Sequence, residues 1–256
     1  MIHKTAIIDE GARIGEGVTI GAYSIIGADV EIGIGTQVSP HVVINGPSSI
    51  GEYNKIFQFS SIGEVPQDKK YNGEPTRLVI GDRNVIREYV NMNRGTISGL
   101  GETVIGDDNL FMASCHVAHD CIVGNNTVFA NFASLSGHVE VGDFAILGGF
   151  TAVHQFTQIG RNSLCGLGSV VSQDIPPFCT AAGDRARTIG INKEGLKRIG
   201  FSAELIRALH QTFRMLMKSK VPKEEAFQKL QPLCTEYPEV AEFVNFIKES
   251  KRGVAQ

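Results

Sequence analysis

The sequence predicts a parallel β-coil of triangular cross-section, followed by a short helical region. Three observations predict this fold: an apolar residue recurs every six positions, glycine is abundant at 29 of 256 residues, and helical spacing replaces the repeat near the C-terminus. A period of six does not fit the turn of a helix, which is about 3.6 residues. It is even, so it keeps the alternation of a strand, and three segments close one coil of 18 residues.

The first run of the repeat begins at Ile8. Ten positions in a row are aliphatic, and six of them are followed by glycine. We expect the aliphatic side chains to fill the interior of the coil and the glycine to supply the turn into the next segment. The ten positions are Ile8, Ile14, Ile20, Ile26, Ile32, Val38, Ile44, Ile50, Ile56 and Ile62.

Two interruptions follow. Residues 63–79 are polar and rich in proline and glycine, which predicts a loop that leaves the coil. The repeat resumes at Ile80, and a second interruption over residues 94–103 contains three glycines. Loops that leave a rigid scaffold often carry function, and neutral insertions are the alternative.

The second run is uninterrupted and ends at Val171. One coil cannot bury its own apolar face, so the stack is stabilised by contacts between neighbouring coils. We therefore assign residues 1–190 to the coil and residues 191–256 to a helical domain. The positions of this run are Ile105, Phe111, Val117, Val123, Phe129, Leu135, Val141, Leu147, Val153, Ile159, Cys165 and Val171.

Residues 174–177 contain two prolines and end the stack. Ser202 is suited to cap a helix that runs to about Ser219, and further helices are expected to begin at Pro222 and Pro238.

The charge is unevenly distributed along the chain. From residue 192 onward there are 12 Lys and Arg against 8 Asp and Glu, whereas the preceding residues have 12 against 19. A basic tail on an acidic body favours an acidic partner near the C-terminus, and a solvated helix face is the alternative. We expect no nucleic-acid partner.

The remaining composition indicates a cytoplasmic protein. The five cysteines are odd in number and form no CxxC pair, which is typical of reduced thiols. No apolar stretch approaches the ~18 residues that span a bilayer, and the N-terminus lacks the apolar core of a signal peptide. We therefore expect no membrane insertion.

Histidine is concentrated in the second run. Four of the seven histidines lie within 39 residues, at His116, His119, His138 and His154. Adding 18 to His119 gives Gly137, beside His138, and adding 18 again gives Gln155, beside His154. These residues are therefore expected to share one strip of surface on three successive coils.

Two chemistries fit this strip. One histidine could act as a general base, with Asp120 orienting His119 and a backbone N–H near Gly137 stabilising an oxyanion. Strand alternation alone, however, would send the side chains of His119 and Asp120 to opposite faces. Alternatively, three histidines could bind a divalent metal, with a neighbouring subunit completing the site.

Several motifs resemble the UDP-N-acetylglucosamine acyltransferase family. They are IGEVPQDKKY at 62–71, GEPTRL at 73–78, DDNL at 107–110, HVAHDC at 116–121, GHV at 137–139, TAVHQF at 151–156, GINKEGLKR at 190–198 and RG at 252–253. The resemblance covers essentially the whole chain. It implies a left-handed parallel β-helix of hexapeptide repeats with a small C-terminal α-helical domain.

The resemblance also implies a function. The family forms homotrimers with active sites in the grooves between subunits. It transfers a 3-hydroxyacyl chain from acyl carrier protein to the 3-hydroxyl of UDP-N-acetylglucosamine, the first step of lipid A biosynthesis, without a metal or cofactor. Acyl carrier protein is acidic, which would explain the basic tail.

The resemblance assigns roles by position. His119 matches the general base, Asp120 its orienting partner and Gly137 the oxyanion amide. The residues that match substrate, nucleotide or carrier contacts are Asp68, Lys70, His116, His138, His154, Gln155, Asn192, Glu194 and Arg198.

Three positions depart from the family pattern. Ile199 replaces a second arginine, and Asn93 replaces a histidine. Leu167 stands where the family sets acyl length, and its bulk predicts a chain shorter than fourteen carbons.

Two other classes remain open. A γ-type carbonic-anhydrase-like enzyme on the same scaffold would bind zinc or iron, and a non-catalytic β-helix scaffold would have neither activity. Sister acyltransferases carry a domain before their β-helix, whereas here the repeat begins at residue 8.

Overall fold

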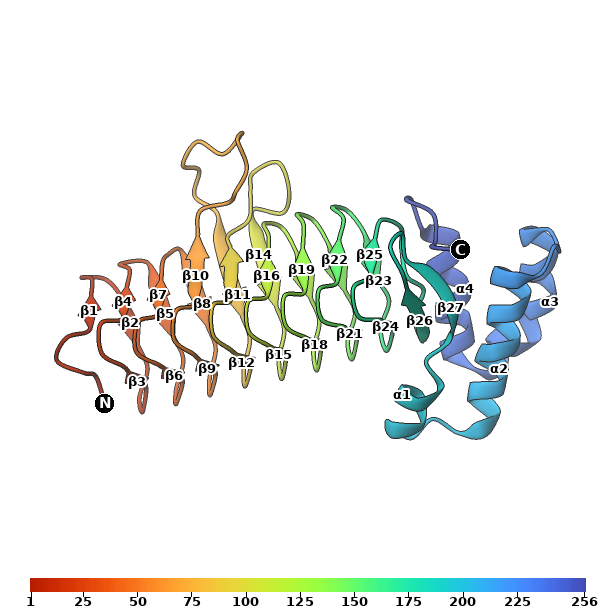
Figure 1. The fold of residues 1–256 in the computed structure, drawn as a ribbon, viewed down its shortest axis with the longest axis horizontal. Coiled ribbons are helices and arrows are strands. Elements are labelled where there is room, and N and C mark those ends of the chain that lie inside the picture. The colour runs from red at the N-terminus through yellow and green to blue at the C-terminus, as the bar shows by residue number, and fades with distance from the viewer.

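The computed structural model describes residues 1–256 and has the form of a long three-sided coil with helices packed at its C-terminal end (Figure 1). Each coil contributes one short strand to each of three sheets. Ser134 pairs in parallel with His116 on one side and with Ala152 on the other, so one circuit takes 18 residues. The fold is a left-handed parallel β-helix: the period predicted the coil, and the family resemblance implied its handedness.

Three sheets form the faces of the prism. The first contains β1 (Ile7–Ile8), β4 (Ile25–Ile26), β7 (Val43–Ile44), β10 (Ser61–Glu64), β13 (Asn91–Asn93), β16 (His116–Val117), β19 (Ser134–Leu135), β22 (Ala152–Val153) and β25 (Val170–Val171). The second contains β2 (Arg13–Ile14), β5 (Val30–Ile32), β8 (Ser48–Ile50), β11 (Arg77–Ile80), β14 (Glu102–Ile105), β17 (Ile122–Val123), β20 (Glu140–Val141) and β23 (Gln158–Ile159). The third contains β3 (Thr19–Ile20), β6 (Gln37–Val38), β9 (Lys55–Ile56), β12 (Val85–Ile86), β15 (Leu110–Phe111), β18 (Val128–Phe129), β21 (Ile146–Leu147), β24 (Leu164–Cys165), β26 (Cys179–Ala182) and β27 (Arg187–Ile191).

The interior of the coil is a single apolar column. Every position of the repeat from Ile20 to Val171 is buried, whereas Ile8 and Ile14 are partly exposed at the open N-terminal end. The rings of Phe111 and Phe129 lie 4.7 Å apart on successive coils. The hexad periodicity therefore identifies the core correctly.

The expectation that glycine makes the turns is wrong. In five of the six Ile–Gly pairs the glycine does not have a positive φ. A Cβ on Gly21 would instead lie 2.4 Å from the backbone nitrogen of Pro40 on the next coil. Glycine is therefore needed for the close approach of successive coils. The left-handed conformation falls two residues later in four of these five pairs, at Gly17, Tyr23, Gly35 and Tyr53.

The C-terminal end is closed by an antiparallel pairing of β26 with β27, which the sequence did not reveal. The Ser202 hydroxyl caps α2 by accepting a hydrogen bond from the backbone N–H of Leu205, as expected. The helices expected at Pro222 and Pro238 are also present. The helices are α1 (Lys193–Arg198), α2 (Ala203–Phe213), the π-helix η1 (Arg214–Lys218), α3 (Lys223–Glu236) and α4 (Pro238–Glu249).

The chain then returns from α4 to the last coil. The Asp174 backbone N–H donates to the Gly253 carbonyl at 3.0 Å, and the Ala255 N–H donates to the Asp174 carbonyl at 2.9 Å. The Ser250 hydroxyl donates to the Asp174 carboxylate at 2.6 Å. These bonds fix the helices to the coil. None of the helices has both the length and the apolarity that a membrane span requires.

Candidate active site

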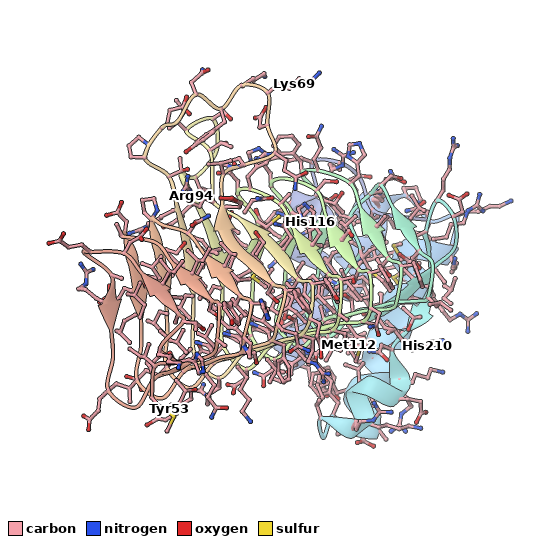
Figure 2. All side chains as sticks on the ribbon, turned by 60° about the vertical axis from the view of Figure 1, so that its left-hand side comes forward. Tyr53, Lys69, Arg94, Met112, His116 and His210 are labelled. Carbon is pink, nitrogen blue, oxygen red and sulfur yellow. The ribbon has the colours of Figure 1, made fainter.

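Both interruptions of the repeat leave the coil between the first and second sheets, which we call the loop corner. The first excursion connects β10 to β11 and the second connects β13 to β14, and the two lie side by side (Figure 1). Figure 2 places Lys69 at the tip of the first excursion and Arg94 at the base of the excursions. The Arg94 guanidinium donates to the Gly46 carbonyl and to the Tyr71 hydroxyl, so the first excursion is fixed to the coil.

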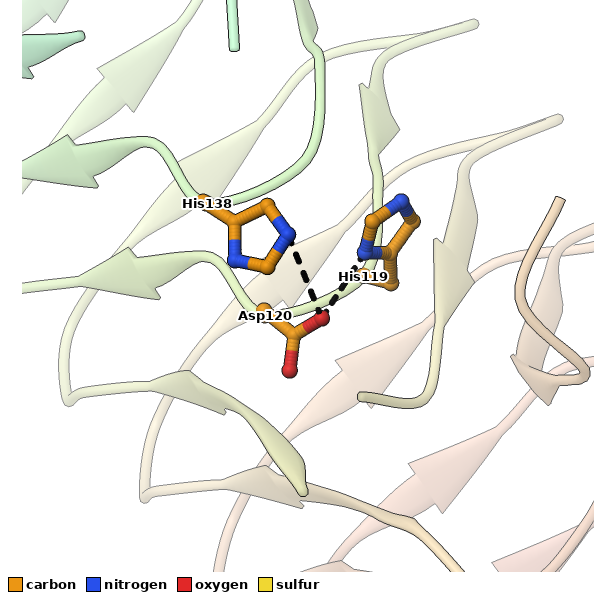
Figure 3. Close-up of side chains that lie close together, drawn as sticks. All are labelled: His119, Asp120 and His138. Carbon is orange, nitrogen blue, oxygen red and sulfur yellow. Dashed lines mark hydrogen bonds and ion pairs between the residues drawn. The ribbon is translucent and has the colours of Figure 1, made fainter. Parts of the chain in front are cut away.

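The coil after the second excursion holds a histidine–aspartate pair at this corner (Figure 3). His119 Nδ1 lies 2.8 Å from Asp120 Oδ2, and His119 Nε2 has no hydrogen-bond partner within the chain. Asp120 has a φ of 59°, a left-handed conformation that turns its side chain toward His119. The expectation from strand alternation therefore fails, because the pair lies at a corner and not within a strand.

The Asp120 carboxylate is fully buried, with 0% of its side chain exposed. It accepts hydrogen bonds from Thr96 and from the backbone N–H of Leu100 in the second excursion. Burial raises the pKa of Asp120, but the hydrogen bonds from Thr96 and His119 and the nearby His138 hold it below its ordinary value. An ionised carboxylate has no proton to donate, so His119 Nδ1 carries a proton, and in the neutral imidazole Nε2 has the lone pair.

His138 stands one coil further along the same corner. Its Nε2 lies 3.8 Å from Asp120 Oδ2, and its ring meets the His119 ring edge-on at 5.1 Å between centroids. The opposite neighbour is Phe156, whose ring is stacked at 4.4 Å. Burial lowers the pKa of His138, as does His119, and the Asp120 and Asp68 carboxylates oppose this shift. The pKa of His138 therefore lies below its ordinary value beside the pair.

Gly137 lies directly against His119. A Cβ on Gly137 would come within 2.5 Å of His119 Cε1 and 2.7 Å of His119 Nε2, so only glycine leaves room for the imidazole. The Gly137 backbone N–H makes no hydrogen bond within the chain.

A cavity of about 480 Å³ lies between the histidines and the first excursion. Five predicted site residues share it, from segments up to 87 residues apart: Asp68, Lys70, His119, His138 and Gln155. The other lining residues are Gln67, Ser98 and Phe156. Phe156 lies 18 residues after His138, so the repeat could have identified it, whereas no periodicity places residues of the excursions.

Two predicted histidines do not line this cavity. His116 Nδ1 is 2.7 Å from the Asn91 side-chain oxygen, and burial and the neighbouring His119 lower its pKa. His154 is exposed and contacts Arg252 at 3.2 Å. His154 therefore lies at the loop corner without reaching the cavity that contains His119.

The three predicted residues of the C-terminal domain, and Leu167 of the coil, also lie outside the cavity of a single chain. Asn192 caps α1 through Gly195 and donates to the Asn162 carbonyl, and the Glu194 carboxylate pairs with the Lys197 ammonium at 2.9 Å. Arg198 ends α1. Leu167, 78% exposed, lies at a different corner, between β24 and β25.

Asn93 and Ile199, the other two departures from the family pattern, can be located in the structure. The Asn93 side-chain N–H donates to the Val65 carbonyl at 2.9 Å and so secures the first excursion. Ile199 is exposed at the end of α1.

The metal alternative can be judged from the same geometry. Ligand atoms of His119, Asp120 and His138 all lie within 4.8 Å of one another, close enough to surround a cation. The Asp120 oxygens, however, already accept four hydrogen bonds from Thr96, Leu100 and His119. A cation would have to displace these donors, so the arrangement favours an oriented base over a metal centre.

A second, larger cavity of about 580 Å³ lies in the helical domain. No carboxylate lines it, and burial together with Lys193 and Arg214 lowers the pKa of His210. We call it the basic groove. Its lining residues are Lys193, Ile206, Arg207, His210, Gln211, Arg214, Met215, Ser219 and Val221.

Comparisons with known proteins agree across the whole chain. Residues 174–255 match the family model described as UDP-N-acetylglucosamine O-acyltransferase, domain 2, and residues 102–137 match the bacterial transferase hexapeptide model. LpxA from Acinetobacter baumannii is 42% identical, with a TM-score of 0.97, and the match covers 100% of this chain and 99% of that one.

Two further solved structures extend the comparison. The UDP-N-acetylglucosamine O-acyltransferase from Moraxella catarrhalis is 41% identical, with a TM-score of 0.97 and coverage of 100% of this chain and 99% of that one. The Arabidopsis UDP-N-acetylglucosamine acyltransferase is 34% identical, with a TM-score of 0.87 and full coverage of both chains.

Proposed function

The chain belongs to the UDP-N-acetylglucosamine O-acyltransferase family, and we propose that it transfers a 3-hydroxyacyl chain from acyl carrier protein to the 3-hydroxyl of UDP-N-acetylglucosamine, the first step of lipid A biosynthesis. One observation carries the proposal for the site. His119 Nδ1 is bonded to a buried carboxylate at 2.8 Å, while its Nε2 is unpaired in a residue that lines the cavity. That is the arrangement of a general base.

In this mechanism His119 Nε2 takes the proton of the sugar 3-hydroxyl while the oxygen attacks the thioester carbonyl. Asp120 keeps the proton on Nδ1 and stabilises the imidazolium that forms. The oxyanion of the tetrahedral intermediate accepts a hydrogen bond from the Gly137 N–H, which has no partner within the chain. Collapse of the tetrahedral intermediate expels the thiolate of acyl carrier protein, which takes the proton from the His119 imidazolium.

The cavity residues supply the remaining functions. Asp68 and Lys70 on the first excursion, with Gln155 and His138 on the coil, provide polar groups for the sugar nucleotide. No cofactor is required, because the thioester brings an activated acyl group and His119 supplies the base.

The proposed donor is acyl carrier protein, and the basic groove supports it. An acidic protein is attracted to a surface with four cationic or titratable side chains and no carboxylate in its lining. The excess of basic residues after residue 191 has the same effect at longer range.

We further propose a homotrimer in which a neighbouring subunit completes each site. The corner between the third and first sheets is a column of exposed, stacked aromatic rings, which is typical of an interface. Leu167 continues this column, so a partner could bring it to the cavity and limit the chain to fewer than fourteen carbons. The column contains Tyr23, His41, Phe59, Tyr89, Phe132 and Phe150.

The substrates and the reduced state of the five cysteines favour a cytoplasmic location.

Incubation of the purified protein with UDP-N-acetylglucosamine and a panel of acyl carrier protein thioesters tests the proposal. We expect a 3-O-acyl product in the presence of a metal chelator. Absence of product with every thioester in the panel would refute acyl transfer. Loss of activity with the chelator, restored by zinc, would favour a carbonic-anhydrase-like metal site.

A further inference from the structure

The second excursion folds directly over the Asp120 carboxylate. The backbone N–H groups of Thr96 and Leu100 each donate to Oδ1 at 3.0 Å, and the Thr96 hydroxyl lies 2.6 Å from Oδ2. His119 supplies the remaining bond. Three of the four hydrogen bonds to this carboxylate therefore come from a segment that departs from the repeat.

We propose that Thr96 is a positioning residue for acyl transfer, which fixes the Asp120 carboxylate against His119 through its hydroxyl and its backbone N–H. The inference rests on the proposed function in one respect, because it takes His119 to be the base. The proposal also assigns a role to the second excursion. The segment positions Asp120 and His119 and need not contact the substrate to do so.

The direction of the hydrogen bonds follows from the charge. Because an ionised carboxylate only accepts, the Thr96 hydroxyl must donate to Asp120, and its oxygen is then free to accept from the Ser98 hydroxyl 3.0 Å away. Ser98 itself lines the cavity that contains His119. A directed chain of donors thus leads from the cavity to the carboxylate and orients it.

The neighbouring coils show what the excursion adds. The corner position of Asp120 is occupied by His138 on the next coil and by Phe156 on the one after, with the same left-handed φ. The exposed fraction rises along this series, from 0% for the Asp120 side chain to 18% for the His138 side chain and 53% for Phe156. The covering excursion therefore coincides with the one coil whose corner residue in this series is a carboxylate.

Glycine makes the close approach possible. A Cβ on Gly99 would lie 2.4 Å from Asp120 Cγ and 2.7 Å from His138 Cε1. The backbone of the excursion therefore packs directly on both side chains, and Asp120 has no exposure to water. On the other side, the Asp120 backbone N–H donates to the Thr103 hydroxyl at 2.8 Å, where the excursion rejoins the coil.

The position of Thr96 has a consequence for pH dependence. Burial raises the pKa of Asp120 and the Thr96 hydrogen bonds lower it, so loss of the hydroxyl should move this pKa upward. The titratable groups facing Asp120 are His119 and His138, and Asp68 faces His138 from the first excursion. The loss of unfolding free energy that accompanies protonation of Asp120 should therefore begin at a higher pH in Thr96→Val than in the original protein.

The test uses steady-state kinetics of the full-length Thr96→Val and Thr96→Ser enzymes with UDP-N-acetylglucosamine and the best carrier thioester. We expect Thr96→Val to lower kcat roughly 10- to 100-fold, the effect of one hydrogen bond to a charged group, with KM changed less than about twofold. The acid-induced loss of unfolding free energy should begin at a higher pH in Thr96→Val, and Thr96→Ser should recover most of kcat.

A matched control is Thr127→Val. Thr127 is also buried, and its hydroxyl donates to the Asn109 side chain at 2.7 Å, away from the cavity. This control should leave kcat and the pH at which the unfolding free energy begins to fall unchanged. If Thr96→Val does not fold, as judged by circular dichroism, Thr96→Ala makes the same comparison with a smaller side chain.

A double-mutant cycle with Asp120→Asn decides how Thr96 acts. Thr96→Val should cost less than about threefold in the Asp120→Asn background, because the charged acceptor is gone. An unchanged kcat in Thr96→Val, a change in KM alone, or an equal loss in both backgrounds would overturn the inference. His119→Ala is measured in parallel: if it keeps full activity the proposed base is wrong, whereas its loss beside an unaffected Thr96→Val refutes only the role of Thr96.

Discussion

The regular coils from Ile105 to Val171 and the interrupted coils before them are built differently. In the regular stretch, a buried side chain recurs at every sixth position, and each corner takes four residues. In the interrupted stretch, the chain leaves the same corner twice and packs over it. The regular coils thus supply rigid, repeated positions, whereas the excursions supply walls and hydrogen-bond donors.

The proposed chemistry lies where the two stretches meet. His119 stands on a regular coil, but the bonds that orient its partner Asp120 come from the second excursion, and Asp68 and Lys70 face it from the first. The scaffold and the site should therefore respond to different substitutions.

The largest effect on function is expected from His119→Ala. Removal of the base should lower kcat about 10³-fold. The thermal midpoint should fall only modestly, because three of the four hydrogen bonds to the buried Asp120 carboxylate remain. The acyl-transfer rate and the melting temperature are measured for the original protein and for each variant. His3→Ala, which removes an exposed histidine at the N-terminus, should leave both unchanged. A His119→Ala enzyme within tenfold of the original rate would contradict the assignment.

The largest effect on stability is expected from Phe129→Ala within the regular coils. The ring is fully buried against Phe111, so its loss should destabilise the protein by about 3–5 kcal/mol. Urea unfolding followed by circular dichroism measures this. Phe144→Ala, at an exposed corner, is the control and should cost much less. Equal losses would mean that the apolar column does not stabilise the coil.

Gly137→Ala tests whether the packing of one coil against the next controls the position of His119. The added Cβ must displace the His119 imidazole, which should lower kcat about 10- to 100-fold with little change in the unfolding midpoint. Gly190→Ala introduces the same methyl group where no atom lies within 4 Å, and it should have no effect on rate. Full activity in Gly137→Ala would show that His119 can move without loss.

The contribution of Asp120 to the free energy of unfolding should depend on pH in a way that distinguishes it from exposed carboxylates. Its pKa is lowered in the folded protein, so its contribution is present above the unfolded pKa of about 3.9 and is lost as the pH falls through the folded value. The difference in unfolding free energy between the original protein and Asp120→Asn should therefore be constant near neutral pH and shrink below about pH 4. Asp9→Asn, exposed at the same corner of the first coil, should give no such difference. A difference independent of pH would rule out this ionisation.

The smallest effect is expected from Leu167→Gly, which removes an exposed side chain from the corner between the third and first sheets. The ratio of kcat/KM for longer over shorter acyl donors should rise about fourfold for each additional methylene, because one methylene in an apolar site is worth about 0.8 kcal/mol. Ile34→Gly, at a third corner, is the control. An unchanged donor preference would refute the length-setting role.

The sequence reveals the regular stretch almost completely. A strict period identifies each inward residue, and a circuit of 18 places Gly137 beside His119 and Gln155 in the same cavity. The same arithmetic brings Phe156 onto His138. These predictions work because each coil repeats the geometry of the one before it.

The contacts made by the interrupted stretch cannot be predicted from the repeat. The repeat marks where the excursions leave and return, but the positions of Thr96 and Leu100 over Asp120 depend on non-periodic contacts. The glycine turns were misassigned for a related reason, since the approach of one coil to the next is not visible in a single hexad. The β26–β27 pairing likewise lacks a repeat.

A crystal structure with bound UDP-N-acetylglucosamine would show which side chain meets the acceptor hydroxyl. We expect the sugar 3-oxygen to lie within about 2.6–3.2 Å of His119 Nε2, while Asp120 remains bonded to Nδ1. A complex in which the 3-oxygen meets a different side chain, or in which His119 has turned away from Asp120, would contradict this expectation.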